Sequence, residues 1–148
     1  MALTSRSRLL RTIDAGRVRA SIQSAELRTS GEIRVSISRF FWGRIEPVAR
    51  RAFRRLGMTA TQDRNGILFF VVPSRRRFVV LGDEGIHAKV GPDFWTSVAA
   101  AMSGRFKKGE FTEGLIEGIA TVGEKLAGHF PHAGEADRNE LPDEIDCR

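Results

Sequence analysis

The sequence predicts a single α/β domain built around a small mixed β-sheet. Residues 32–39 alternate apolar and polar side chains, residues 45–56 carry a helical apolar stripe, and residues 65–73 are apolar throughout after Asn65. A strand, a helix and a second strand in this order indicate parallel strands joined by a right-handed crossover. A third apolar segment at 77–82 follows a short link, so we expect it to return as the antiparallel arm of a hairpin.

The N-terminal part of the chain predicts a helix that packs on the domain. Apolar side chains recur near helical spacing over residues 12–28, at Ile13, Val18, Ile22 and Ala25. The strand at 32–39 follows with one protected face, whose apolar positions are Ile33, Val35 and Ile37.

The middle and C-terminal elements are predicted by the same kinds of pattern. The helix at 45–56 has a continuous apolar stripe, and Gly57 stands where a C-terminal cap belongs. The segment 65–73 has no polar face, which is typical of a central strand covered on both sides. Two further helices are expected, at 94–105 and 112–130.

These patterns divide the chain into an N-terminal helical segment at 1–29, a domain at 30–130 and an acidic tail at 131–148. The tail has little apolar content, so we expect it to be loosely attached. Residues 135–146 hold six acidic side chains and one arginine, a net charge of −5, whereas the whole chain carries +6. The body is therefore strongly basic and attracts anions, and the sequence leaves open whether the tail covers it.

Composition places the chain among ordinary globular proteins, with 41% hydrophobic and 28% charged residues. No stretch approaches the roughly 20 apolar residues of a membrane-spanning helix. The first residues lack the apolar region of a secretory signal, so we expect a cytoplasmic protein. Cys147 is the only cysteine, which excludes an intramolecular disulfide and a cysteine-based zinc site.

Strand directions bring two loops to one edge of the predicted sheet. The start of the second strand, DRNG at 63–66, and the end of the third strand, GDEG at 82–85, fall together there. Their side chains offer several oxygen atoms, the ligands that Ca²⁺ and Mg²⁺ prefer. We therefore predict a divalent-cation site formed by Asp63, Asn65, Asp83 and Glu84.

The same residues have a structural interpretation that needs no ligand. Asp83 would cap a helix that starts at Glu84, the neighbouring glycines would ease the turn, and the loop 63–66 would form a simple turn. Spacing alone favours this interpretation, because Asp and Asn are preferred at caps and turns. The ligand spacing of an EF-hand loop is absent.

Catalysis at this edge would have to be metal-assisted. The sequence has no nucleophile elbow, no Walker loop, no dinucleotide-binding glycine motif and no H-E-x-x-H zinc motif. In the enzyme alternative, a weak metal-dependent phosphatase, Asp63 and Asp83 hold the cation. Glu84 or His87 then moves a proton, although a lone histidine is more often a surface or structural residue.

Arginines gather on the helix at 45–56 and in the link before residue 78. They stand four residues apart in two pairs on the helix, so that each pair shares a face. Such side chains bind the phosphates of a nucleic acid, an acidic lipid surface or an acidic protein, with nucleic acid the less favoured partner. The alternative is a solvated helix face. The candidate anion-binding residues are Arg50, Arg51, Arg54, Arg55, Arg75, Arg76 and Arg77.

Several linked blocks carry a family resemblance. GEIRVSIS, a following helix, DRNGILFFVVPSRRRFVVLGDEGIHAKVG and FKKGEFTEGLIEGI resemble the TPM domain over residues 30–130. The resemblance implies a three-layer α/β/α sandwich around the mixed sheet. It also implies an unsettled function: some members are described as acid phosphatases, others show no such activity, and some bind Ca²⁺ or Mg²⁺ at the sheet edge.

By position, the family's Asn-Gly turn maps to Asn65 and Gly66 with Asp63 before it, and its glycine-rich segment maps to 82–85. Common members have a G-x-G-x-E segment where this chain has GDEG, so the acidic residue is shifted. The signal peptide and membrane anchor of many relatives are not seen, so their periplasmic roles do not transfer. The sequence therefore predicts a small binding or accessory module with a Ca²⁺ or Mg²⁺ site, with phosphatase activity and anion binding as alternatives.

Overall fold

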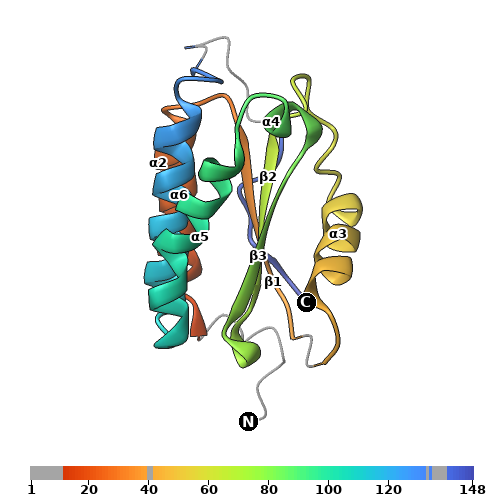
Figure 1. Ribbon diagram of the computed structural model, residues 1–148, viewed down its shortest axis with the longest axis vertical. Helices are drawn as coiled ribbons and strands as arrows, with labels where there is room; N and C mark the ends of the chain where they lie inside the picture. Colours follow the sequence, from red (N-terminus) through yellow and green to blue (C-terminus); the bar gives the residue numbers. More distant parts are fainter. Residues whose placement is uncertain (1–11, 40–41, 133, 135–139) are drawn as a thin grey trace.

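The computed structural model describes residues 12–39, 42–132, 134 and 140–148. A four-stranded sheet lies between two helical layers, which confirms the three-layer α/β/α sandwich (Figure 1). The helices of one layer are α2 (Ala15–Glu26), α5 (Pro92–Lys107) and α6 (Phe111–Leu126), and α3 (Ile45–Arg55) forms the other. No helix in the described ranges is both long and apolar enough to cross a membrane.

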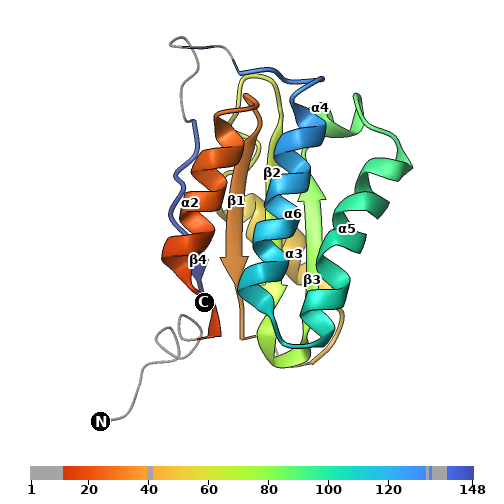
Figure 2. The same ribbon diagram turned by 90° about the vertical axis from the view of Figure 1, so that its left-hand side faces the viewer.

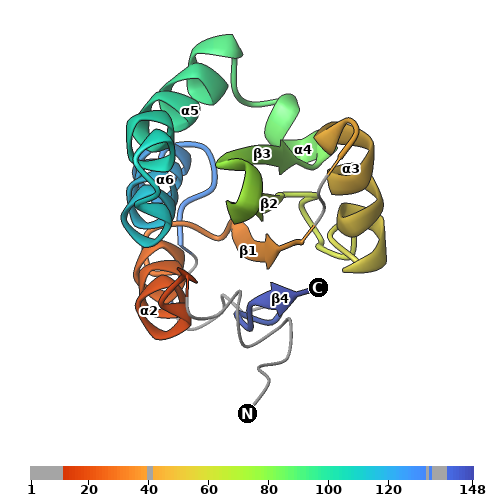
Figure 3. The same ribbon diagram turned by 90° about the horizontal axis from the view of Figure 1, so that it is seen from below.

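The sheet has the predicted strand directions. Its strands are β1 (Glu32–Ile37), β2 (Gly66–Val72), β3 (Arg77–Gly82) and β4 (Asp146–Cys147), in the spatial order β3-β2-β1-β4. β1 and β2 are parallel, and β3 returns antiparallel to β2 after the short 3-10 turn η1 (Pro73–Arg75). Viewed from below, the sheet separates α3 from the three-helix layer (Figure 3).

Two hydrophobic cores hold the layers together, one on each face of the sheet. Alternate residues of β1 and β2, such as Val35 and Phe69, pack beneath α2, α5 and α6, which lie side by side across that face (Figure 2). On the other face, Leu68 and Phe70 pack against α3. Every residue of β2 is buried, because this strand has a full-length neighbour on each side and is covered on both faces.

The helix boundaries follow capping chemistry. α2 begins after Asp14, whose side chain accepts a hydrogen bond from the backbone N–H of Arg17, so the helix is shorter than the predicted 12–28. Gly57 follows α3 with a φ of 66°, as expected for a C-terminal glycine. The short helix α4 (Glu84–His87) begins directly after Asp83.

The C-terminal end differs from the expectation of a loosely attached tail. Leu141 packs in the core on the α3 face and Ile145 in the core on the three-helix face, so the segment wraps around the edge of the sheet. Asp146 and Cys147 then pair with β1 in parallel. Two well-placed apolar side chains and a strand pairing therefore suffice to hold a segment of low apolar content. The expected tail residues 133 and 135–139 lie outside the described ranges.

Carboxyl groups gather where this segment meets the body. The Glu26 carboxyl group accepts a hydrogen bond of 3.1 Å from the backbone N–H of Ile33 and also forms a hydrogen bond with the side chain of Asp143. The Glu32 side chain accepts a hydrogen bond of 2.7 Å from the backbone N–H of Glu140. The C-terminal segment is thus attached to the end of α2 and the start of β1 through acidic side chains.

Candidate functional site

The two loops predicted to meet at one edge of the sheet do meet. The backbone N–H of Asp83 donates to the Gly66 carbonyl, and that of Gly85 donates to the Arg64 carbonyl, both at 2.9 Å. The contact is very close, because a Cβ atom added to Gly85 would lie 2.1 Å from the carbonyl oxygen of Asp63. Only glycine allows the backbone of α4 to approach the loop 63–66 so closely.

Arg64 is the residue that the sequence analysis missed at this edge. Its guanidinium donates to both carboxylate oxygens of Asp83, at 2.6 and 2.8 Å, and to Glu84 at 3.1 Å. The hydrogen bond with Asp83 raises the already high pKa of Arg64, so this side chain is a permanent cation. The signal was present in the sequence, because Arg64 stands between two predicted ligands in DRNG.

Asp83 acts as a helix cap, which confirms the structural interpretation of its role. Its Oδ1 atom accepts a hydrogen bond of 2.8 Å from the backbone N–H of Glu84, and the carboxylate is only 5% exposed. Together with Arg64, the cap occupies both carboxylate oxygens of Asp83. A cation could bind to Asp83 only after Arg64 had moved away.

Asn65 and Asp63 occupy different environments although they are two residues apart. Asn65 is 1% exposed, and its side-chain amide donates to the Ser30 carbonyl at 3.3 Å. Its Oδ1 atom has no hydrogen-bond partner among the described residues. Asp63 is exposed. With Arg64 bound to Asp83 and Glu84, the oxygen atoms of these residues do not converge on one empty position, and no three His, Cys, Asp or Glu side chains in the described part of the chain are placed to hold a metal ion.

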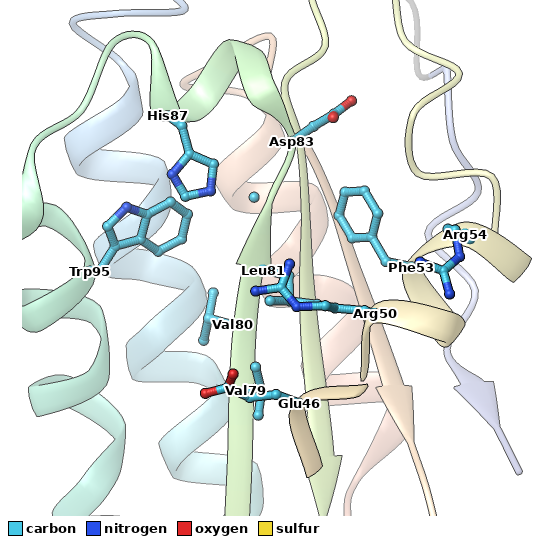
Figure 4. A pocket seen from close by; sticks show the side chains of 11 residues that line it. Glu46, Arg50, Phe53, Arg54, Val79, Val80, Leu81, Asp83, His87 and Trp95 are labelled. Carbon is cyan, nitrogen blue, oxygen red and sulfur yellow. The ribbon is translucent and has the colours of Figure 1, made fainter. Parts of the chain in front are cut away.

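His87 faces a different direction from the acidic side chains. Its ring lies 4.9 Å from that of Trp95, measured between ring centroids. The Asp83 carboxylate points away from the His87 ring (Figure 4), and Glu84 is paired with Arg64. The two predicted proton-transfer residues, Glu84 and His87, are neighbours on α4 but have separate side-chain partners.

A groove of about 470 Å³ runs along β3 (Figure 4). Val79, Val80 and Leu81 of β3 form its floor, and Glu46, Arg50, Phe53 and Arg54 of α3 form one wall. His87 and Trp95 form the opposite wall. Trp95 lies directly over Gly82, where an added Cβ would be 2.5 Å from the indole ring. Apolar residues and arginines are therefore combined in one concave site.

The predicted arginines are divided among three places rather than gathered in one patch. Arg50 and Arg54 line the groove, whereas Arg51 and Arg55 line a separate hollow beside β1. Arg55 is engaged there by Asp146, at 2.9 and 3.2 Å. The hairpin arginines lie elsewhere, since Arg76 donates to the carbonyl of Lys107 in α5. The remaining hairpin residues are Arg75, which donates to the Gly43 carbonyl, and Arg77, which is exposed.

Comparison with known proteins identifies the family. The family model of the TPM domain matches residues 3–125. The chain belongs to the TPM domain family. This match includes α2 and all of the loops and helices that build the groove, and it confirms the resemblance of the sequence blocks. A search of curated proteins finds no match for this TPM domain.

Solved structures share the fold of this TPM domain. The BA42 protein from the psychrophilic bacterium Bizionia argentinensis is 36% identical, covers 91% of this chain and 92% of its own, and superposes with a TM-score of 0.85. The N-terminal domain of a P. gingivalis protein is 18% identical over 91% of this chain and 99% of its own, with a TM-score of 0.62. The N-terminal domain of the cg2496 protein from Corynebacterium glutamicum is 11% identical over 82% of this chain and 74% of its own, with a TM-score of 0.59.

Proposed function

We propose that this TPM domain is a binding module that takes an anionic partner in the groove along β3. The single observation that supports this function is the placement of Arg50 and Arg54 on the wall of a concave site with an apolar floor. Most binding sites combine such an apolar surface with a few charged groups that fix the orientation of the ligand. The groove therefore has the composition of a binding site rather than that of a solvated helix face.

The charges of the groove favour an anion. Neither Arg50 nor Arg54 forms an ion pair with any described residue. The acidic residues near them are Glu46, on the same helix, and Asp83, which Arg64 neutralises. Unpaired cations beside a low-dielectric surface attract negative charge from solution and gain a partner on binding.

Phosphatase activity is the enzyme alternative that the family resemblance implies. In this chain the proposed proton-transfer residues have separate partners, Arg64 for Glu84 and Trp95 for His87. General acid–base catalysis needs such groups within reach of one reacting atom. The arrangement of the groove therefore supports binding better than hydrolysis.

Binding of a polyanion to the groove tests the function. Trp42 is 79% exposed and is not among the residues that line the groove, so Trp42→Phe leaves Trp95 as the only tryptophan reporter. We expect poly-L-glutamate to change the Trp95 emission with an affinity that falls as salt is added. The double variant Arg50→Gln/Arg54→Gln should bind about tenfold more weakly, because two solvent-exposed ion pairs with the ligand are lost.

The matched control changes the net charge by the same amount at one arginine of α3 and at the residue that caps its N-terminus. Arg44 and Arg51 are exposed and do not line the groove, so Arg44→Gln/Arg51→Gln should bind as tightly as the parent. Equal weakening in both double variants would show an unspecific charge effect and refute the groove as the site. Absence of any binding at low salt would refute the function itself.

A Ca²⁺ or Mg²⁺ site at the acidic edge is a second candidate function, favoured by the convergence of Asp83 and Glu84 on one cationic group. Because Arg64 holds the position that a cation would take, we expect the two to compete. Millimolar Ca²⁺ or Mg²⁺ should raise the unfolding temperature of Arg64→Gln more than that of the wild type. The added change Asp83→Asn should abolish the difference, and equal shifts in wild type and Arg64→Gln would contradict the site.

A further inference from the structure

We propose that the anionic partner is an extended peptide segment that adds to the free edge of β3 as a fifth strand of the sheet. The inference rests on the proposed function and names the partner of the same groove. Peptides commonly bind in this way when a sheet presents an edge whose backbone groups are unpaired. The edge, the floor and the walls of the groove each support the proposal.

The edge of β3 is open to hydrogen bonding. Among the described residues, β3 is the outermost strand of the sheet and pairs only with β2. Within the described ranges, the backbone groups of residues 78–81 make no hydrogen bond outside that antiparallel ladder. Alternate residues of an antiparallel edge strand direct both the N–H and the carbonyl away from the sheet. β3 therefore offers a row of donors and acceptors to a neighbouring strand.

The sequence of β3 lacks most of the features that prevent an edge strand from pairing with another strand. Proteins usually blunt an exposed edge with charged residues, proline, a bulge or a covering segment. Residues 78–81 read FVVL, and each of them is partly exposed, whereas every residue of β2 is buried. Arg77, at the start of the strand, is its only charged residue. An apolar and regular edge that no described segment covers is a template for a further strand.

The walls define the chemistry of the added strand. Val79 and Leu81 pack toward the core on the α3 face, and Val80 packs toward the core on the three-helix face. An added strand would alternate in the same way, with every second side chain directed toward α3. There it meets Arg50 and Arg54, and its other side chains meet Trp95. The expected partner segment therefore alternates acidic and apolar residues.

A nucleic acid fits these features less well. Its phosphates would pair with Arg50 and Arg54, yet a nucleic acid cannot continue the ladder of backbone hydrogen bonds along β3. The apolar floor of Val79, Val80 and Leu81 equally favours side chains over a phosphate backbone. We therefore assign the groove to an acidic peptide and use duplex DNA as the competing probe.

The test uses a synthetic six-residue peptide with blocked ends and alternating glutamate and valine. We expect it to bind the wild-type protein and to protect alternate amides of residues 78–82 from hydrogen exchange, with no added protection in β1. N-methylation of the peptide amides that face β3 should weaken binding about tenfold, because hydrogen bonds to the strand are lost. N-methylation of the other alternate amides should change the affinity less than about twofold.

Each outcome separates strand addition from the more general anion binding. If the peptide and a block peptide of three glutamates and three valines bind equally without protecting β3, strand addition fails while binding through Arg50 and Arg54 stands. If duplex DNA binds more tightly than the peptide and displaces it, the peptide assignment is overturned. If neither poly-L-glutamate nor the peptide binds, both the function and its mode are refuted.

Discussion

Gly85→Ala is expected to lower the free energy of unfolding by about 3 kcal/mol, near the upper end of the range for overpacking changes. The new Cβ would lie 2.1 Å from the carbonyl oxygen of Asp63 and 2.6 Å from that of Arg64. Backbone atoms cannot move aside as a flexible side chain can, so the loop 63–66 and α4 must separate. Their separation would also break the hydrogen bond from Gly85 N–H to the Arg64 carbonyl.

Denaturant unfolding of the purified variants measures this effect. Gly104 provides the control, because it is exposed in α5 and an added Cβ would meet nothing within 4 Å. Gly104→Ala should raise the free energy of unfolding by about 0.5 to 1 kcal/mol, since alanine is the better helix former. A Gly85→Ala protein as stable as the wild type would show that the two loops are not in close contact.

Glu26→Gln is expected to make the protein more stable at neutral and alkaline pH. Burial and the hydrogen bond with Asp143 raise the pKa of Glu26 from 4.5 to about 10, and the charge of Glu32 adds to this effect. The folded protein thus keeps a proton on Glu26 that the unfolded chain loses above pH 4.5. The stabilising contribution is complete below pH 4.5 and is lost progressively up to about pH 10.

Unfolding in urea at pH 5, 7 and 9 checks the sign. One such group lowers the free energy of unfolding by at most about 1.4 kcal/mol per pH unit within this window. Glu26→Gln removes that slope, because the amide remains neutral and keeps a hydrogen-bond acceptor for Ile33. A variant whose stability decreases with pH as steeply as that of the wild type would argue against the buried proton.

Glu113→Gln serves as the contrasting change. Its backbone N–H and its ion pair with Arg17 lower the pKa of Glu113, so this carboxyl contributes stability above its unfolded pKa and loses it in acid. The substitution should therefore weaken the protein at neutral pH relative to acid pH, the opposite trend to Glu26→Gln. Because Glu113 is on the surface, its effect should diminish when salt is added.

Strand directions could be predicted because they follow from the order of elements along the chain. One crossover and one hairpin decide that the loops 63–66 and 82–85 share an edge, and no side-chain detail is needed. The guanidinium of Arg64 could not be placed in this way. Its backbone has a φ of 50°, which sequence patterns do not indicate for arginine, and from this conformation its side chain reaches Asp83 and Glu84.

The last strand and the division of the arginines also depend on three-dimensional detail. β4 has two residues and pairs with β1 more than a hundred positions away, so local periodicity contains no sign of it. The spacing on α3 did predict which arginines share a face. The spacing could not predict that Arg50 and Arg54 border a groove while Arg55 contacts Asp146.

The pairing of β4 with β1 has a consequence for the order in which the sheet assembles. Ser36 of β1 and Asp146 of β4 form a hydrogen bond across 110 residues of sequence. Closing so long a loop costs considerable chain entropy, and the short ladder offers few hydrogen bonds in return. We therefore expect β4 to join a sheet that β1, β2 and β3 have already formed. With only two residues in its ladder, β4 is also the strand at which we expect the sheet to open first.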